Sequence, residues 1–257
     1  MKKFLISFIF LLISSTLVFS ADMRFIQVDG VLYESKYPQK LSSLIEKINQ
    51  EKGVEFIVFS GNNIAKPNRD ELKNFLKEAK KLKKPYYIVL GQKDVNKNKD
   101  LGKDDYIKIV KKNVRAHKFI SSPNYVFKKK DLIFIVADGS KEIVPTSSGY
   151  YKEDVILWLD EQLDKYNDKK VIILQHYPLI PPVKKETHYT YKAEDYLKLL
   201  SEHNNVKALV AGHFNVNKEE MVNNIIHIST KNAPTYRIID ILDYDTPEPI
   251  FWSVIKE

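Results

Sequence analysis

Apolar runs of strand length alternate with amphipathic segments along most of this chain. The runs 23–29, 54–60 and 85–91 are separated by segments 41–52 and 68–82, in which apolar residues recur at helical spacing. Such alternation predicts parallel strands that are connected by helices, and therefore an α/β fold. The pattern excludes an all-helical or a purely antiparallel protein.

The second half of the chain continues the pattern and then changes it. After residue 218 the sequence holds short strand-like stretches divided by Asn223-Asn224 and Pro247, which predict an antiparallel run that belongs to a second sheet. One domain of two sheets flanked by helices accounts for the whole pattern. The remaining predicted elements are a helix over 104–114, a hairpin over 124–138, a helix over 152–166, a strand over 169–176, a helix over 191–203 and a strand over 206–213.

The first twenty residues have the pattern of a secretory signal peptide. Lys2 and Lys3 precede an apolar run from residue 4 to 19, and cleavage is expected after Ser20. The alternative, an uncleaved anchor, would favour a longer run of about 20 apolar residues. We therefore expect an exported protein, periplasmic or extracellular, whose domain comprises residues 21–257. No later run is long enough to cross a bilayer.

Composition limits the partners and the chemistry. The chain has no cysteine, which excludes disulfides, thiolate metal sites and a cysteine nucleophile. Its formal net charge of +8 comes mainly from lysines spread over predicted helix surfaces. Arginine is scarce and no aromatic residues interleave with the basic ones, so we expect no nucleic-acid partner. The sequence identifies no protein partner.

Polar residues follow directly after five of the predicted strands. Because the carboxyl ends of parallel strands meet at one edge of a sheet, and ligands bind there in open α/β folds, these residues are expected to converge. They are Asp29, then Asn62 and Asn63, then Gln92, Lys93 and Asp94, then His176, and finally His213 and Asn215.

The order of these strand ends resembles the calcineurin-like metallophosphoesterases. That family carries Asp-x-His, Gly-Asp, Gly-Asn-His-Asp/Glu, a lone His and Gly-His-x-His after successive strands. In this chain QVDG, FSGNN, LGQKD, LQHYP and AGHFN stand at these positions, and the last two match most closely. The resemblance implies an αββα sandwich of two mixed sheets flanked by helices. It also implies an edge where ligands hold two divalent metals that activate water against phosphorus.

Several residues depart from the family pattern. Asp29, Asp94, His176 and His213 are retained. The family His ligands are replaced by Val31 and Asn215, the bridging carboxylate by Asn62, the Asn ligand by Gln92 and the acid His by Lys93.

These changes leave different donors at the two metal positions. The first position keeps only Asp29 as a strong ligand, and we expect it to be empty. The second keeps His176 and His213 with the amides of Gln92 and Asn62, a neutral set that can hold one Zn²⁺, Mn²⁺ or Fe²⁺ weakly. Lys93 nearby repels a cation and is a point charge for a phosphate or carboxylate.

Two hypotheses on function follow. In the first, the chain hydrolyses a phosphoester with one metal at His176 and His213. In the second, which the residue chemistry favours, it is a catalytically impaired, metal-free pseudoenzyme that acts as a binding or envelope-associated module, with a phosphoester or another anion as its candidate ligand. Tyr189 and Tyr191 are candidates for lining a pocket near the LQHYP loop. The other histidines match no motif and are assigned no role: His117, His188, His203 and His227.

Overall fold

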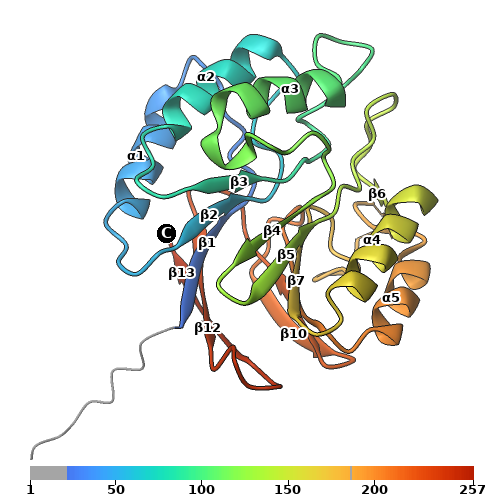
Figure 1. Ribbon diagram of the computed structural model, residues 1–257. Helices are drawn as coiled ribbons and strands as arrows, with labels where there is room; N and C mark the ends of the chain where they lie inside the picture. Colours follow the sequence, from blue (N-terminus) through green and yellow to red (C-terminus); the bar gives the residue numbers. More distant parts are fainter. Residues whose placement is uncertain (1–21, 186) are drawn as a thin grey trace, which may run out of the picture.

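The first of two large sheets holds the N-terminal strands together with the C-terminal ones. A computed structural model describes residues 22–185 and 187–257 (Figure 1). The strands β1, β2 and β3 are parallel. Beyond β1, β12 pairs antiparallel with β1, and β13 pairs antiparallel with β12. In the sheet order these strands are β13 (Ile250–Lys256), β12 (Tyr236–Leu242), β1 (Met23–Val28), β2 (Phe56–Phe59) and β3 (Tyr86–Ile88).

The second sheet has a parallel centre between two antiparallel edge strands. Its four central strands run parallel to one another, while β10 and β4 pair antiparallel at the edges. In the sheet order they are β10 (Lys218–Val222), β11 (Ile225–Ser229), β9 (Val206–Ala211), β7 (Lys170–Leu174), β5 (Leu132–Val136) and β4 (Tyr125–Lys129). A parallel pair of two-residue strands, β6 (Gly149–Tyr150) and β8 (Thr190–Tyr191), lies apart.

Helices cover the outer face of each sheet, which confirms the αββα sandwich. Separate apolar clusters fill the space between the first sheet and its helices, between the two sheets, and between the second sheet and its helices. Figure 1 shows α1, α2 and α3 over the first sheet and α4 and α5 over the second. The helices are α1 (Pro38–Ile48), α2 (Arg69–Ala79), α3 (Lys103–Asn113), α4 (Glu153–Lys165) and α5 (Ala193–Glu202), with a 3₁₀ turn η1 (Arg115–His117).

The helices and strands predicted from local sequence patterns are present, but most are shorter than the predicted ranges. Asn68 caps α2 as its sequence context suggests, because its side chain accepts hydrogen bonds from the backbone N–H groups of Asp70 and Glu71. The predicted second sheet is wrong in one respect. Only β10 and β11 of the C-terminal run join it, whereas β12 and β13 return to the first sheet beside β1.

The signal-peptide prediction falls on residues 1–20, which lie outside the described residues. Within residues 22–185 and 187–257, no helix combines the length and the apolar character that a membrane span requires.

Candidate functional site at the carboxyl ends of the strands

Asp29 follows β1 and is fully buried at the carboxyl edge of the first sheet. One carboxylate oxygen accepts a hydrogen bond from the Ser60 hydroxyl at 3.0 Å, and the other accepts one from the backbone N–H of His213 at 2.9 Å. Ser60 follows β2, and His213 follows β9 of the second sheet. Asp29 therefore links the two sheets, and each of its oxygens already has a protein donor.

His176 follows β7 and is also fully buried. Its Nδ1 lies 2.7 Å from the carbonyl oxygen of Ser60 and 3.4 Å from Asp29 Oδ1, and its Nε2 lies 2.9 Å from Gln92 Oε1. A proton on Nδ1 satisfies the Ser60 carbonyl and leaves the Nε2 lone pair facing Gln92. Gly61 permits this approach, because a Cβ there would lie 2.3 Å from Nδ1.

His213 completes the group at the edge. Its Nδ1 lies 3.2 Å from His176 Nε2, and its own Nε2 is buried without a hydrogen-bond partner among the described residues. Burial, and then the charges of His176 and His188, lower the pKa of His213 to about 2, so the ring is neutral; the main chain of Ser147 opposes this only in part.

His188 is a residue at this edge that sequence reasoning missed. Its ring centroid lies 5.0 Å from that of His213. The only sequence signal was its place in the THYTY segment, which attracted attention for its tyrosines. Those tyrosines are exposed, with Tyr191 packing edge-on to Tyr150 at 5.6 Å.

Asn62 and Lys93 are joined through the main chain. Asn62, at a positive φ of 53°, accepts a hydrogen bond on Oδ1 from the backbone N–H of Lys93 at 3.0 Å. Gly91 permits the contact, because a Cβ there would lie 2.4 Å from the backbone nitrogen of Asn62. The amide oxygen at the bridging position is thus engaged, while the Lys93 side chain is exposed and lines a cleft.

Asp94 braces the loop. Its buried carboxylate accepts hydrogen bonds from the backbone N–H groups of Gly91, Asn63 and Ile64, at 2.7 to 3.1 Å, and from the Asn63 side chain. Burial raises its pKa to about 6, although these three backbone donors favour the carboxylate. Asp94 therefore ties the loop after β3 to the loop after β2.

Val31 and Asn215 stand where the family has histidines. Asn215 uses its amide oxygen to accept a hydrogen bond from the backbone N–H of Asn232 at 3.0 Å, and Val31 packs against the first apolar cluster. Both line the same cleft as Lys93. Val31 offers no donor atom, and the Asn215 oxygen already serves as an acceptor within the protein.

The donors at this edge fit one metal ion and not two. His176 Nε2 lies 2.9 Å from Gln92 Oε1 and 3.2 Å from His213 Nδ1, and with each ring proton on the opposite nitrogen these three atoms would offer neutral lone pairs to one cation. Neutral imidazole and amide donors suit Zn²⁺ or Mn²⁺. A second metal would depend on Asp29 alone, whose oxygens are occupied by Ser60 and His213.

A different group of strong ligands lies on the helices that cover the second sheet. Among the described residues, the only set of three carboxylate or imidazole ligand atoms within 4.8 Å of one another belongs to Asp160, Asp164 and His203. His203 Nε2 lies 2.7 Å from Asp160 Oδ1, which is an ordinary ion-pair geometry.

The other two histidines that match no family motif are buried. His117 accepts a hydrogen bond from the backbone N–H of Ile88, and His227 lies in β11.

Fold and site together define a metallophosphoesterase-like protein. A model of the calcineurin-like phosphoesterase family matches residues 26–217, and the chain belongs to that family. Among curated proteins it is similar to a probable glycerophosphodiester phosphodiesterase GpdQ from Arcobacter nitrofigilis, with 26% identity over 193 residues. That alignment covers 72% of this chain but only 64% of the relative, so the chain spans less than two thirds of that protein.

Two solved structures show the same fold. A dimetal phosphatase from Danio rerio superposes with a TM-score of 0.67 at 14% identity, covering 90% of this chain and 99% of its own. GAP50, described as the anchor in the inner membrane complex of Plasmodium, superposes with a TM-score of 0.59 at 16% identity, covering 93% and 90%.

Proposed function

We propose that this chain is an exported member of the calcineurin-like phosphoesterase family that binds a phosphoester or another anionic ligand at the sheet edge, with two-metal hydrolysis lost. The proposal rests mainly on the charge and the hydrogen bonding of the Asn62 side-chain amide. It occupies the bridging position, carries no charge, and accepts a hydrogen bond from the backbone of Lys93. No anion is therefore available there for two metals to share.

Lys93 supports the binding half of the proposal. It stands where the family acid stands, it is exposed, and it lines the cleft beside the edge. An ammonium group binds a phosphate or carboxylate as a point charge, but at the pH of most compartments it is a poor proton donor to a leaving group. GAP50 carries this fold and is described as an anchor, which is consistent with a binding role for the fold.

A second candidate is an active phosphoesterase with one metal. The convergence of His176 Nε2, His213 Nδ1 and Gln92 Oε1 favours it, as does the relative named as a phosphodiesterase. A metal bound by these three residues would act as a Lewis acid on a phosphoryl oxygen. The chain itself would hold His176 in orientation through the Ser60 carbonyl and place Lys93 at the mouth of the site.

Metal content separates the two candidates. The mature protein, residues 21–257, is incubated with Mn²⁺, Fe²⁺ or Zn²⁺, freed of unbound ion, and analysed by mass spectrometry of the metals together with turnover of p-nitrophenyl phosphate and its diester. We expect less than one metal per chain and no turnover. One retained metal that is lost in His176→Ala, but kept in His203→Ala, together with turnover, would overturn the pseudoenzyme proposal.

Export rests on residues 1–20 and has its own test. N-terminal sequencing of the protein from the cell envelope or medium should begin at Ala21. An intact N-terminus in the cytoplasm would contradict it.

A further inference from the structure

A cleft of about 1060 Å³ opens beside the sheet edge and runs from the former metal position towards α1 and the C-terminus. Its size lies at the upper end of the range for small-molecule sites. Lys93, Val31 and Asn215 line the end nearest His213, and residues of α1 and of the loop before β12 line the rest. The cleft therefore continues the site of the proposed function into a region that the metal ligands do not reach.

The cleft carries an excess of uncompensated positive charge. Lys40, Lys66, Lys93 and Lys231 line it, and within the described part of the chain no carboxylate lies within 4.0 Å of their amines. Two acidic residues also line the cleft: Glu34 pairs with Lys36 at 3.5 Å, and Glu257, the last residue, is exposed, so the four lysines outnumber the acidic side chains. Unpaired ammonium groups around a concavity attract and hold anions.

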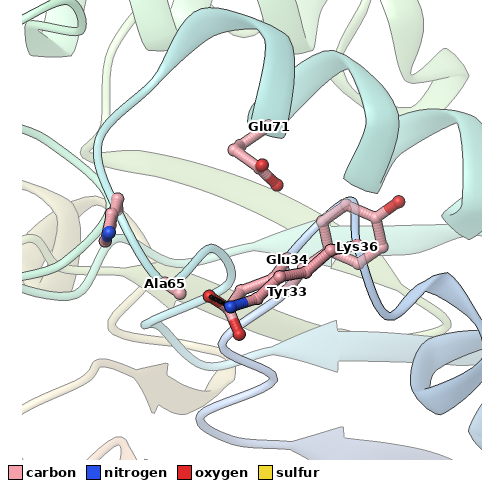
Figure 2. Close-up of a pocket in the computed structure, with 6 residues that line it drawn as sticks. Tyr33, Glu34, Lys36, Ala65 and Glu71 are labelled. Atoms are coloured by element: carbon pink, nitrogen blue, oxygen red, sulfur yellow. Dashed lines mark ion pairs between the residues drawn. The ribbon is translucent and has the colours of Figure 1, made fainter.

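A smaller pocket of about 230 Å³ lies next to this cleft and shares Glu34, Ala65 and Lys66 with it. Figure 2 shows the Glu34 and Lys36 side chains together at its base, with Glu71 reaching from α2 above them. Glu71 is also engaged, because its carboxylate accepts hydrogen bonds from the backbone and hydroxyl of Ser35. Glu34 and Glu71 are thus engaged within the protein, and Glu257 is the acidic residue of the cleft lining that remains beside the four lysines.

Part of the cleft lining is apolar, beside the polar residues Ser43, Asn215, Asn232 and Thr235. Val31, Leu32, Ala65, Ala233 and Pro234 contribute to this apolar wall and all keep some exposure. Leu32 has a φ of 50°, a left-handed conformation that is unfavourable for a non-glycine residue. Two main-chain hydrogen bonds, Leu32 N–H to the Asn62 carbonyl and Tyr33 N–H to the Asn63 carbonyl, hold it there. The strained backbone fixes a leucine in the lining of a lysine-rimmed cleft.

We propose that this cleft binds a single phosphate ester that carries an apolar chain, with the phosphate at the lysines and the chain along the wall around Leu32. The inference rests on the proposed function, because it takes the anion at Lys93 as the anchor of the ligand. It adds the apolar half, which neither a metal site nor a simple phosphate site requires. The replacement of a family histidine by Val31 extends this wall up to the edge.

Binding of three probes tests the proposal: inorganic phosphate, octyl phosphate and octyl glucoside, each followed by calorimetry on the mature protein. Octyl phosphate should bind about tenfold or more tightly than inorganic phosphate, since burial of a few methylenes suffices for that gain. Octyl glucoside, which lacks the charge, should bind at least about tenfold more weakly than octyl phosphate. Equal binding of octyl glucoside would overturn the proposal.

Variants locate the two halves of the ligand. Leu32→Asn keeps a residue that tolerates the left-handed backbone and should lower the ratio of octyl phosphate affinity to phosphate affinity to about one. Leu157→Asn, at an exposed leucine on α4, is the matched control and should change neither. If Leu32→Asn does not fold, as judged by circular dichroism, Val31→Ser makes the same test.

The lysines separate this inference from the proposed function. Lys93→Gln should weaken both phosphate and octyl phosphate, whereas Lys108→Gln on α3 should weaken neither. Equal affinities for the two probes, both lost in Lys93→Gln, would overturn the apolar cleft and leave the proposed function standing. A preference for octyl phosphate that Leu32→Asn abolishes but Lys93→Gln leaves untouched would support the apolar wall and overturn Lys93 as the anchor. Absence of binding by either phosphate probe would overturn both.

Discussion

Among the described residues, histidine nitrogens lie within 4.0 Å of carboxylate oxygens at two places, at the sheet edge and on the surface of α4 and α5. At the edge, His176 and Asp29 are fully buried, and each oxygen of Asp29 accepts a hydrogen bond from the protein. On the helices, His203 pairs with Asp160 while the Asp164 side chain is 76% exposed. Burial is therefore the difference between the two places.

The comparison shows that the positions expected of metal ligands and the solvent-accessible charged ligand side chains lie in different parts of the molecule. At the edge, the carboxylate of Asp29 and the amide oxygens of Asn62 and Asn215 all accept hydrogen bonds from the protein. The helix surface has the charged donors, in an arrangement that an ordinary surface ion pair explains. Removing a carboxylate from the edge should thus disrupt the fold, whereas removing one from the helices should not.

Asp94→Ala should have the largest effect. The substitution leaves the buried N–H groups of Gly91, Asn63 and Ile64 without an acceptor, and we expect a loss of about 3 to 5 kcal/mol in the free energy of unfolding. The matched variant Asp164→Ala, at an exposed position, should change it by no more than about 0.5 kcal/mol. Urea unfolding of both variants at pH 7 makes the measurement, and equal losses would contradict the contrast between the regions.

His117 tests the burial argument at a position outside the metal-ligand set. Burial lowers its pKa to about 4 from 6.5, so the folded protein keeps the ring neutral while the unfolded chain takes up a proton between these values. Stability should therefore fall as the pH drops from 6.5 to 4, by up to about 3 kcal/mol from this residue.

The variant His117→Gln keeps an acceptor for the Ile88 N–H and removes the titration. Its unfolding free energy should decline less steeply over that pH range than that of the wild type. Leu157→Asn, at an exposed position of α4 with no titratable group, should leave the slope unchanged. An unchanged slope in His117→Gln would show that His117 is not the group that titrates.

Restoring the family ligands tests whether side-chain replacements alone account for weak metal binding at the edge. Val31→His, Asn62→Asp, Lys93→His and Asn215→His together return an anion at the bridging position and three imidazoles, and remove the cation. We expect Mn²⁺ affinity to rise about 100-fold or more over the wild type, measured by competition with a chelator. Adding Asp164→Ala to this variant should change nothing, because the metal is expected at the edge. A folded variant without Mn²⁺ would show that the motif alignment is wrong.

Local patterns in the sequence predicted the strands, the helices and the candidate edge. Each apolar run carries its own strand signal, and Asn68 its own cap, so these features are visible within a few residues. The ends of β7 and β9 then meet because neighbouring parallel strands share an edge, which brings His176 and His213 together. The approach of Asp29, which follows β1 of the first sheet, depends on how the two sheets pack.

Two features depended on pairing between distant segments and were not predictable in this way. The return of β12 to the first sheet depends on its ladder with β1, in which Gln27 lies opposite Arg237. The approach of His188 to His213 depends on the path of the loop that pairs β8 with β6. Nor does any spacing show that the Asn62 amide is engaged by the Lys93 backbone, because that bond joins two loops thirty-one residues apart.

The smallest effect is expected at the helix surface itself. His203→Gln removes the ion pair with Asp160, which joins α4 to the end of α5 at 2.7 Å and is partly solvated. Such pairs contribute about 0.2 to 1 kcal/mol, so we expect a loss of about 0.5 kcal/mol at pH 6 and less in 1 M salt, where the charges are screened. Urea unfolding at both salt concentrations checks this. A loss above about 2 kcal/mol, or Zn²⁺ binding that disappears in this variant and persists in His176→Ala, would reverse the comparison and make the helix surface the metal site of the molecule.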